Sequence, residues 1–218
     1  MCGRFSLTVD GEALCRYYRV DAGNVIFEPN SNIAPGQYIP VITGGPRREA
    51  FMMRWGLIPR WSREPAKGYR MFNARAETVD RKPAFREPFL KRRCLIPADA
   101  FYEWKKAAGR KIPFRIYLPG KRLFSLAGIW DCWVAEDGRR ILSCSILTTD
   151  SNDYLKDIHD RMPVILADDD YQQTWLEERR ITEVKKLLHP YPGEMMAVPY
   201  SPESGIMNPA RGAFPGQE

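Results

Sequence analysis

The sequence has no apolar run long enough for a membrane-spanning helix. No stretch of its 218 residues approaches the ~20 consecutive apolar positions that such a helix requires. The first twenty residues include Arg4, Asp10 and Arg16 and lack the apolar segment of a secretory signal. We therefore expect no membrane partner and an intracellular location, cytoplasmic or nucleoid-associated if the source is bacterial.

Patterns of metal ligands and paired cysteines are also missing. Five cysteines and two histidines are scattered along the chain, and no C-x-x-C pair occurs. An odd number of cysteines in an intracellular chain favours reduced thiols, and the scattered positions lack the spacing of a zinc site. We expect neither a disulfide framework nor a metal site, and no organic cofactor is implied.

The charge balance is moderately basic. The formal net charge is +6, from 33 Lys and Arg against 27 Asp and Glu. Such an excess is compatible with a polyanionic partner but is weak evidence by itself. The basic residues form small groups, at 47–48, 91–93, 105–106 and 139–140, without a basic tail or stripe. Groups of this size are more often solvated surface than a binding face.

Short apolar runs broken by Gly, Pro and Asp are typical of antiparallel strands. We predict an α+β fold: a single domain over residues 1–218 with a central, mostly antiparallel, barrel-like β core, a few peripheral helices and an irregular tail after about residue 200. Strands are expected at 38–43, 49–57, 93–104, 114–118, 123–133, 140–148 and 195–200, and helices at 11–19, 168–177 and 182–189. The pair Asp137-Gly138 predicts a hairpin with a type I′ turn.

Cys2 is the most informative single residue. Removal of the initiator methionine would leave Cys2 with an α-amine of ordinary pKa about 7.7–8.0 and a thiol of about 8.5. The amine can form an imine with an aldehyde, and the adjacent thiolate can then close a five-membered thiazolidine. An internal cysteine has no free amine and cannot form this ring. By position alone, the simpler interpretation is a small residue near a chain end.

The residues around Cys2 add a stronger signal. The opening Met1-Cys2-Gly3-Arg4 occurs in class II glutamine amidotransferases and in the SRAP family (SOS-response-associated peptidase). Further segments are NIAPG at 32–36, WGLIPRW at 55–61, FNARAET at 72–78, RCLIPADAFYEW at 93–104 and IHDRMPVIL at 158–166. In order and content they resemble the SRAP signature over about residues 2–200, whereas no glutamine-site motif such as Asn-Gly-Asp is present. Ala76 and Ala100 replace a common serine and a usual glycine, and neither position supplies a reactive group.

The resemblance implies a DNA damage response protein that links covalently to abasic sites in single-stranded DNA through Cys2. It also implies self-removal of Met1 and leaves room for slow reversal of the cross-link. Glu103 would be the general acid and base, because burial among aromatics raises a carboxyl pKa. His159 would transfer protons at the sugar, and Asn73 would hold the imine. Without the resemblance, these three residues are an edge-strand carboxylate, a structural histidine and a turn residue.

Residue type and closeness to these positions also predict a DNA-binding set: Arg4, Pro35, Trp61, Arg75, Trp104 and Arg161. Guanidinium groups suit phosphate oxygens, indole rings suit stacking on bases, and the proline could wedge against the strand. The simpler interpretations are surface ion pairs for the arginines and a tight turn for the proline.

Three other functions stay open from the sequence. A glutamine amidotransferase would hydrolyse glutamine and lose that activity in Cys2→Ala. A conventional peptidase would pair Cys2 with His159. A DNA-binding module without catalysis would leave Glu103 and His159 without a role. Only the SRAP interpretation requires both an unblocked Cys2 amine and an aldehyde in DNA.

Overall fold

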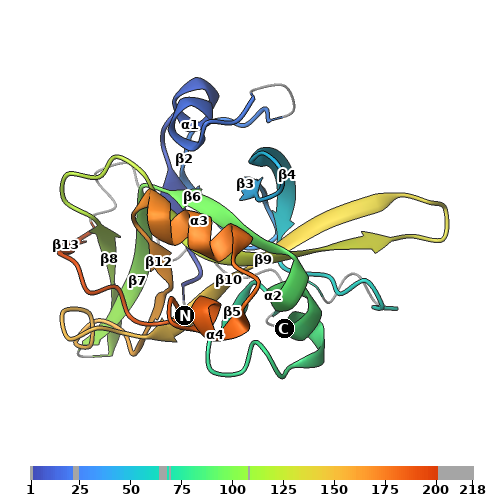
Figure 1. Cartoon of the computed structure of the whole chain (residues 1–218). Helices are drawn as coiled ribbons and strands as arrows, with labels where there is room; N and C mark the ends of the chain where they lie inside the picture. The colour runs from blue at the N-terminus through green and yellow to red at the C-terminus, as the bar shows by residue number, and fades with distance from the viewer. Residues whose placement is uncertain (1, 22–24, 64–67, 69, 108, 201–218) are drawn as a thin grey trace.

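Five strands close into a mixed β-barrel at the centre of the molecule (Figure 1). The structure is a computed structural model that describes residues 2–21, 25–63, 68, 70–107 and 109–200. Around the barrel the strands are β4 (Glu49–Trp55), β3 (Tyr38–Thr43), β6 (Arg93–Ala98), β9 (Phe124–Val134) and β10 (Arg140–Asp150). Neighbouring strands are antiparallel except β10 and β4, whose parallel pairing at Ser143–Arg54 and Cys144–Trp55 closes the ring. The predicted α+β fold with a barrel-like, mostly antiparallel core is confirmed.

Short strands extend the barrel at the end of β10. On one edge, β5 (Asn73–Arg75) pairs in parallel with Ile146–Thr148, and on the other β11 (Arg161–Pro163) pairs antiparallel with Thr148–Asp150. The two-residue β12 (Ile165–Leu166) pairs with β9. Because β5 and β11 flank the same part of β10, they bring two distant segments of the chain close together. Strands this short carry no readable alternation, and the sequence analysis did not predict them.

A second, antiparallel sheet has the order β13–β8–β7–β1–β2. Its strands are β13 (Met196–Pro199), β8 (Arg110–Tyr117), β7 (Ala100–Ala107), β1 (Phe5–Leu7) and β2 (Asn30–Ile33). The pairing of β1 with β7 places the beginning of the chain against the middle of the sheet. The tail expected after about residue 200 lies outside the described residues.

The run 93–104, predicted as one strand, is two strands that belong to different sheets. The break is at Asp99, whose buried carboxylate accepts hydrogen bonds from the Ser6 hydroxyl and from the backbone amide and hydroxyl of Thr8. The backbone amide of Asp99 also donates to the carbonyl of Ser6 at 3.0 Å. Because the Asp99 side chain accepts hydrogen bonds from three donors, it fixes the corner between β6 and β7. The residues before this corner therefore belong to the barrel, and those after it belong to the second sheet.

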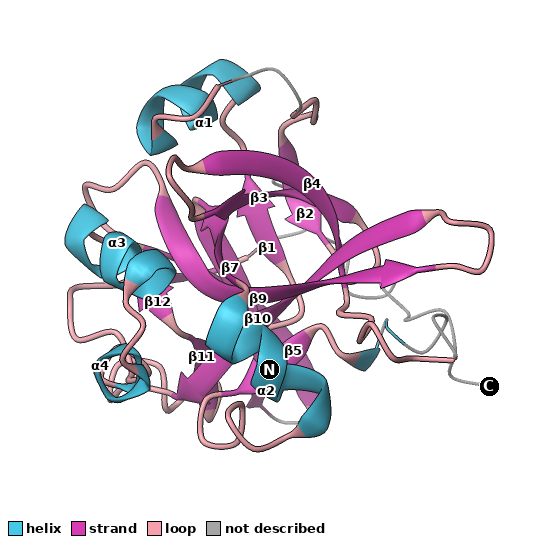
Figure 2. Ribbon diagram, turned by 45° about the vertical axis from the view of Figure 1, so that its right-hand side comes forward, coloured by secondary structure: helices cyan, strands magenta, loops and turns pink. Residues whose placement is uncertain are grey.

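The β9–β10 hairpin forms at Asp137-Gly138, but its turn is not type I′. The amide of Ala135 donates to the carbonyl of Arg139 and the amide of Gly138 donates to the carbonyl of Ala135, which makes a three-residue loop. Only Gly138 has a positive φ, of 83°, whereas a type I′ turn needs two consecutive positive values. The carboxylate of Asp137 instead accepts a hydrogen bond from the amide of Arg139 at 3.0 Å. In Figure 2 this hairpin projects from the barrel.

Helices cover the outside of the sheets (Figure 2). They are α1 (Gly11–Tyr18), α2 (Pro83–Lys91), α3 (Asp169–Glu177) and α4 (Ile181–Lys185). Asp10 caps α1 by accepting a hydrogen bond from the amide of Ala13 at 2.7 Å. The sequence analysis missed α2, which contains Pro88, and α4 is shorter than the predicted 182–189. None of the helices in the described part of the chain is both long and apolar enough to cross a membrane.

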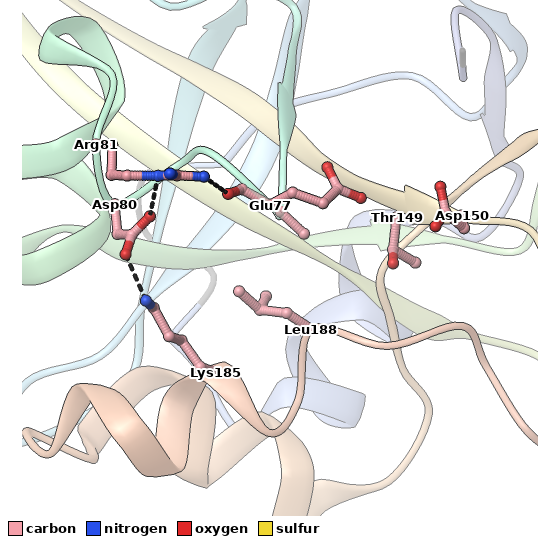
Figure 3. Close-up of a pocket in the computed structure, with 8 residues that line it drawn as sticks. Glu77, Asp80, Arg81, Thr149, Asp150, Lys185 and Leu188 are labelled. Carbon is pink, nitrogen blue, oxygen red and sulfur yellow. Dashed lines mark hydrogen bonds and ion pairs between the residues drawn. The ribbon is translucent and has the colours of Figure 1, made fainter.

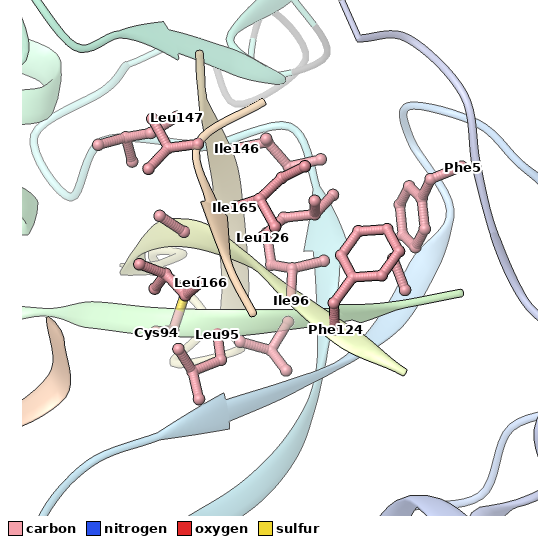
Figure 4. Close-up of a cluster of buried hydrophobic side chains, with 14 of the residues drawn as sticks. Phe5, Cys94, Leu95, Ile96, Phe124, Leu126, Ile146, Leu147, Ile165 and Leu166 are labelled. Carbon is pink, nitrogen blue, oxygen red and sulfur yellow. The ribbon is translucent and has the colours of Figure 1, made fainter. Parts of the chain in front are cut away.

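The apolar core fills the barrel and the space beneath the second sheet (Figure 4). Phe5 from the second sheet and Phe124 of the barrel belong to this one cluster, so the two sheets share one core. Gly128 of β9 has no side chain because a Cβ there would lie 2.8 Å from the sulfur of Cys94 and from Ile96. The closely packed core gives the short strands at the end of β10 a rigid support.

Candidate active site

Cys2 lies fully buried beside the middle of β7. The amide of Tyr102 donates to the carbonyl of Arg4 at 2.9 Å, which extends the pairing of β1 and β7 toward the beginning of the chain. Cys2 is thereby brought next to Glu103. Burial and the nearby carboxylate of Glu103 raise the pKa of the Cys2 thiol well above its ordinary value. The thiol therefore stays protonated at neutral pH and needs a base when it reacts.

Glu103 is the buried carboxylate of this site. It is only 2% exposed, on β7 between Tyr102 and the half-buried Trp104. Burial raises the pKa of Glu103 from its ordinary 4.5 to about 7. Near neutral pH both protonation states are populated, so this carboxyl group can both accept and donate a proton.

His159 is oriented so that one ring nitrogen faces Glu103. The amide of Arg161 donates to Nδ1 at 3.0 Å, and Nε2 lies 3.8 Å from Oε2 of Glu103. Asp160 Oδ1 is also 2.9 Å from Nδ1, which would favour a proton on Nδ1. The amide hydrogen bond decides the tautomer, because a backbone donor is fixed while the side chain of Asp160 is exposed to solvent. Burial also lowers the pKa of His159. The ring is therefore neutral and presents Nε2–H to Glu103.

Asn73 also contacts Cys2. Its Nδ2 donates to the carbonyl of Cys2 at 2.8 Å. Its Oδ1 is buried and accepts no hydrogen bond from the described residues, so it is available to an amine or a hydroxyl group. Two residues further along β5, the side chain of Arg75 is exposed. The four residues predicted as catalytic thus lie together, although they come from four separate parts of the chain.

Arg161, predicted as a DNA contact, is nearly buried and bonded to protein groups. Its guanidinium donates to both carboxylate oxygens of Glu77, at 2.6 and 3.1 Å, to Asp150 at 2.7 Å and to the carbonyl of Thr148 at 2.7 Å. A phosphate could reach it only by displacing one of these acceptors. In the structure the side chain instead anchors the segment whose backbone orients His159.

A cleft of about 590 Å³ lies beside Glu77 and Asp150, the carboxylates that bind Arg161 (Figure 3). Its lining residues are Ala76, Glu77, Asp80, Arg81, Thr149, Asp150, Lys185 and Leu188. Asp80 pairs with Lys185, and Arg81 donates to the carbonyl of Glu77 at 2.7 Å. Glu77 and Asp150 pair with Arg161 outside the lining, and three lining carboxylates stand against two lining cations, so the cleft has no excess positive charge for a phosphate. The chemistry of Cys2 belongs to the neighbouring site.

Trp61 is 63% exposed on the segment that follows β4. Two bonds hold the backbone beside it. The buried carboxylate of Asp131 accepts from the amide of Arg60 at 3.0 Å, and the indole of Trp133 donates to the carbonyl of Ser62 at 2.8 Å. The ring is therefore presented to solvent by a fixed backbone. Sequence reasoning missed Asp131, although a single charged residue inside the apolar run 123–133 was a readable signal.

Arg4 and Pro35, two further predicted DNA contacts, differ in burial and in local structure. Arg4 is half-buried, and burial lowers the pKa of its guanidinium. Pro35 lies in a tight turn in which the amide of Gln37 donates to the carbonyl of Ala34 at 3.3 Å and Gly36 has a φ of 93°. The simpler interpretation of the proline, a turn residue, is therefore correct for its backbone. Among the described residues, no group of three or more His, Cys, Asp or Glu is placed to hold a metal ion.

Comparison with known proteins identifies the family of this chain. The family model described as SOS response associated peptidase (SRAP) matches residues 1–204. The chain belongs to the SRAP family. It is 42% identical over 202 residues to the abasic site processing protein YoaM of Bacillus subtilis, covering 90% of this chain and 88% of that protein. It is 31% identical over 261 residues to the abasic site processing protein HMCES of Xenopus tropicalis, covering 99% and 77%.

The fold is also shared with solved structures. A crystal structure of a protein from Bacteroides thetaiotaomicron superposes with a TM-score of 0.87 at 31% identity, covering 92% of each chain. A second, from Bordetella bronchiseptica, gives a TM-score of 0.80 at 29% identity and covers 92% of this chain. The barrel and the second sheet are therefore the fold that this SRAP chain shares with known structures.

Proposed function

We propose that this SRAP protein captures abasic sites in single-stranded DNA by forming a thiazolidine between Cys2 and the aldehyde of the open sugar. The observation that supports this most directly is the convergence of Asn73, Glu103 and His159 on Cys2. Relatives of similar length, such as YoaM, are named as abasic site processing proteins. The expected place of action is the cell interior, where DNA lies, and the biological setting is the response to DNA damage.

Removal of Met1 is required before the reaction, since only then is the amine of Cys2 free. The amine adds to the aldehyde carbon, and the resulting carbinolamine loses one water to give an imine. The thiol then adds across the C=N bond: a C–S bond forms, and the thiol proton passes to nitrogen. The net change is the loss of one water, without oxidation or reduction.

The surroundings of Cys2 suit these proton transfers. With a pKa of about 7, Glu103 can protonate the departing hydroxyl of the carbinolamine and then accept the thiol proton. His159 presents Nε2–H at 3.8 Å from this carboxylate and would assist opening of the sugar ring. The free carbonyl oxygen of Asn73 would accept a hydrogen bond from the nitrogen or the sugar.

DNA would be held by groups around this site. The exposed Arg75 and the half-buried Arg4 would contact phosphates, and Trp61 and Trp104 would stack on bases. Pro35 would lie against the strand at its turn. Arg161 would join them only by leaving Glu77 or Asp150, so its first role in this proposal is to support His159. Backbone contacts of this kind carry no sequence preference.

A conventional cysteine peptidase is less well supported. Such an enzyme needs a thiolate near neutral pH, which a paired histidine stabilises by lowering the thiol pKa. Here the pKa of Cys2 is raised, and His159 Nε2 faces Glu103. The peptidase activity that we propose is limited to removal of Met1 in the same pocket.

Denaturing electrophoresis with an abasic single-stranded oligonucleotide tests the proposal. Wild-type protein, with loss of Met1 confirmed by mass, should give a shifted band that resists heat and SDS. Cys2→Ala and a form that retains Met1 should give none, and Cys15→Ala is a matched cysteine control that should behave as wild type. Absence of the band from processed wild type would refute covalent capture, and glutamine hydrolysis lost in Cys2→Ala would then support the amidotransferase alternative.

A further inference from the structure

The tip of the β7–β8 hairpin carries four basic side chains and no acidic one. Residues 105–111 read KKAAGRK, so four of seven positions are Lys or Arg. Lys106, Arg110 and Lys111 are exposed, and Lys105 is half-buried. We call Lys105, Lys106, Arg110 and Lys111 the basic tip. Figure 1 shows β7 and β8 at the left of the molecule, on the side away from the β9–β10 hairpin.

The basic tip lacks the ion pairs that are common elsewhere on this surface. Within the described ranges, none of its four cations has a carboxylate at ion-pair distance. By contrast, Arg16 pairs with Glu12 on α1, and Arg139 pairs with Asp137 at the tip of the other hairpin. The positive charge at β7–β8 is therefore not balanced by neighbouring protein groups.

The pairing of the two strands makes this imbalance costly. In the register of β7 and β8, Lys106 stands directly opposite Lys111. The Cβ atoms of opposed residues lie about 4.5–5.5 Å apart, and like charges in this position destabilise a hairpin. Folding alone would favour an acidic residue at one of the two positions. A polyanion that lies across the tip would remove the repulsion.

The tip is close to Cys2 and its partners. Lys106 is three residues beyond Glu103 on β7, about 10 Å at the ~3.3 Å rise of a strand residue. Because side chains alternate, Trp104, Lys106 and Lys111 lie on one face of the hairpin, and Glu103 and Lys105 lie on the other. The charge of Lys106 also contributes to the lowered pKa of His159, after the larger effect of burial.

We propose that the basic tip binds the phosphate backbone of the DNA strand on one side of the reacting sugar, with Trp104 lying between the tip and Cys2. This rests on the proposed function and adds a contact surface to it. Three of its four cations are lysines, whose ammonium groups supply charge without a fixed fork of donors, which suits a flexible single strand. It extends the DNA path from the pocket to the end of the hairpin.

Salt dependence of non-covalent binding tests the proposal. The probe is a fluorescent single-stranded oligonucleotide with a tetrahydrofuran site, which lacks the aldehyde and cannot be captured. Each lost phosphate contact reduces the slope of log K against log salt by about 0.7 for single strands. Lys106→Gln/Lys111→Gln should therefore reduce the slope by about 1.4, and weaken binding about 25-fold at 0.1 M salt. Arg16→Gln/Arg19→Gln removes two charges from the α1 region and should keep the wild-type slope.

A second variant separates binding from stability. Lys106→Glu places an acidic residue opposite Lys111, so it should raise the thermal midpoint while it weakens DNA binding. An unchanged slope in the double variant, or a lower midpoint in Lys106→Glu, would overturn the proposal. Covalent capture by wild type is run beside these assays. If wild type shows no covalent capture, the proposed function is refuted. If wild type captures DNA but the double variant keeps the wild-type slope, only the proposed binding of DNA by the basic tip is refuted.

Discussion

Glu103→Gln should stabilise the folded protein above neutral pH while it abolishes capture. Burial holds the pKa of Glu103 at about 7 in the folded protein, against 4.5 in an exposed carboxyl group. Between these two values the folded state binds more protons than the unfolded state, so stability falls as pH rises. The loss continues through pH 7, where Glu103 is half ionised, and is nearly complete at pH 8. Glutamine has nearly the same shape and never carries the buried charge.

The magnitude follows from the difference between the two pKa values. It is about 2.5, and each pKa unit corresponds to about 1.4 kcal/mol. Wild type should therefore lose about 3 kcal/mol between pH 4 and pH 8 through this one group. The free energy of unfolding of Glu103→Gln should exceed that of wild type by up to this amount at pH 8. For a chain of this size, it corresponds to a thermal midpoint about 6–12 °C higher.

Urea unfolding at several pH values from 4 to 8.5 measures the effect. The stability difference between variant and wild type should be near zero at pH 4 and should grow through pH 5–7. Glu136→Gln is the matched control, because Glu136 is exposed in the loop of the β9–β10 hairpin. A difference that does not depend on pH, or a variant less stable than wild type at pH 8, would refute the argument from burial. Capture should be lost at every pH.

Other residues give further predictions. Arg93→Met should cost about 3 kcal/mol or more in urea unfolding, because the buried guanidinium donates to backbone carbonyls at the ends of α2 and α3. Asp131→Asn should weaken binding of the tetrahydrofuran oligonucleotide up to about tenfold by loosening the segment that presents Trp61, and unchanged affinity would contradict this. Arg161→Lys should slow capture several-fold with little change in that affinity. If affinity falls as far as in Arg75→Lys, then Arg161 contacts phosphate.

The local pattern of apolar and polar residues was sufficient to predict the positions of the long strands. The strand predicted at 38–43 has the bounds of β3, and those predicted at 123–133 and 140–148 match β9 and β10 within two residues. The split at Asp99 could not be foreseen, because the carboxylate bonds to Ser6 and Thr8, more than 90 positions away. The proline within α2 hid that helix, since proline removes a backbone donor.

Basic groups were the least predictable feature. Residues 91–93 were expected on the solvated surface, yet the side chains of Arg92 and Arg93 are nearly buried. Arg93 bonds to carbonyls and lies over the ring of Trp175 at 5.7 Å. In the pair at 105–106, Lys106 is exposed as expected and Lys105 is half-buried, and the lack of acidic partners for this pair depends on β8. Sequence spacing does not tell which cations meet carboxylates, because the partners come from distant segments.

The sequence by itself determined the chemistry that is available: a cysteine that can become an N-terminal aminothiol, the family motifs, and a β-rich fold. Tertiary structure alone decided how those residues behave. Burial beside β7 gives Glu103 its pKa of about 7, the amide of Arg161 fixes the tautomer of His159, and Glu77 and Asp150 occupy the guanidinium of Arg161. The reason is physical: residue type sets which protons and bonds exist, whereas pKa, tautomer and ion pairing depend on solvent exclusion and on neighbours that only folding brings together.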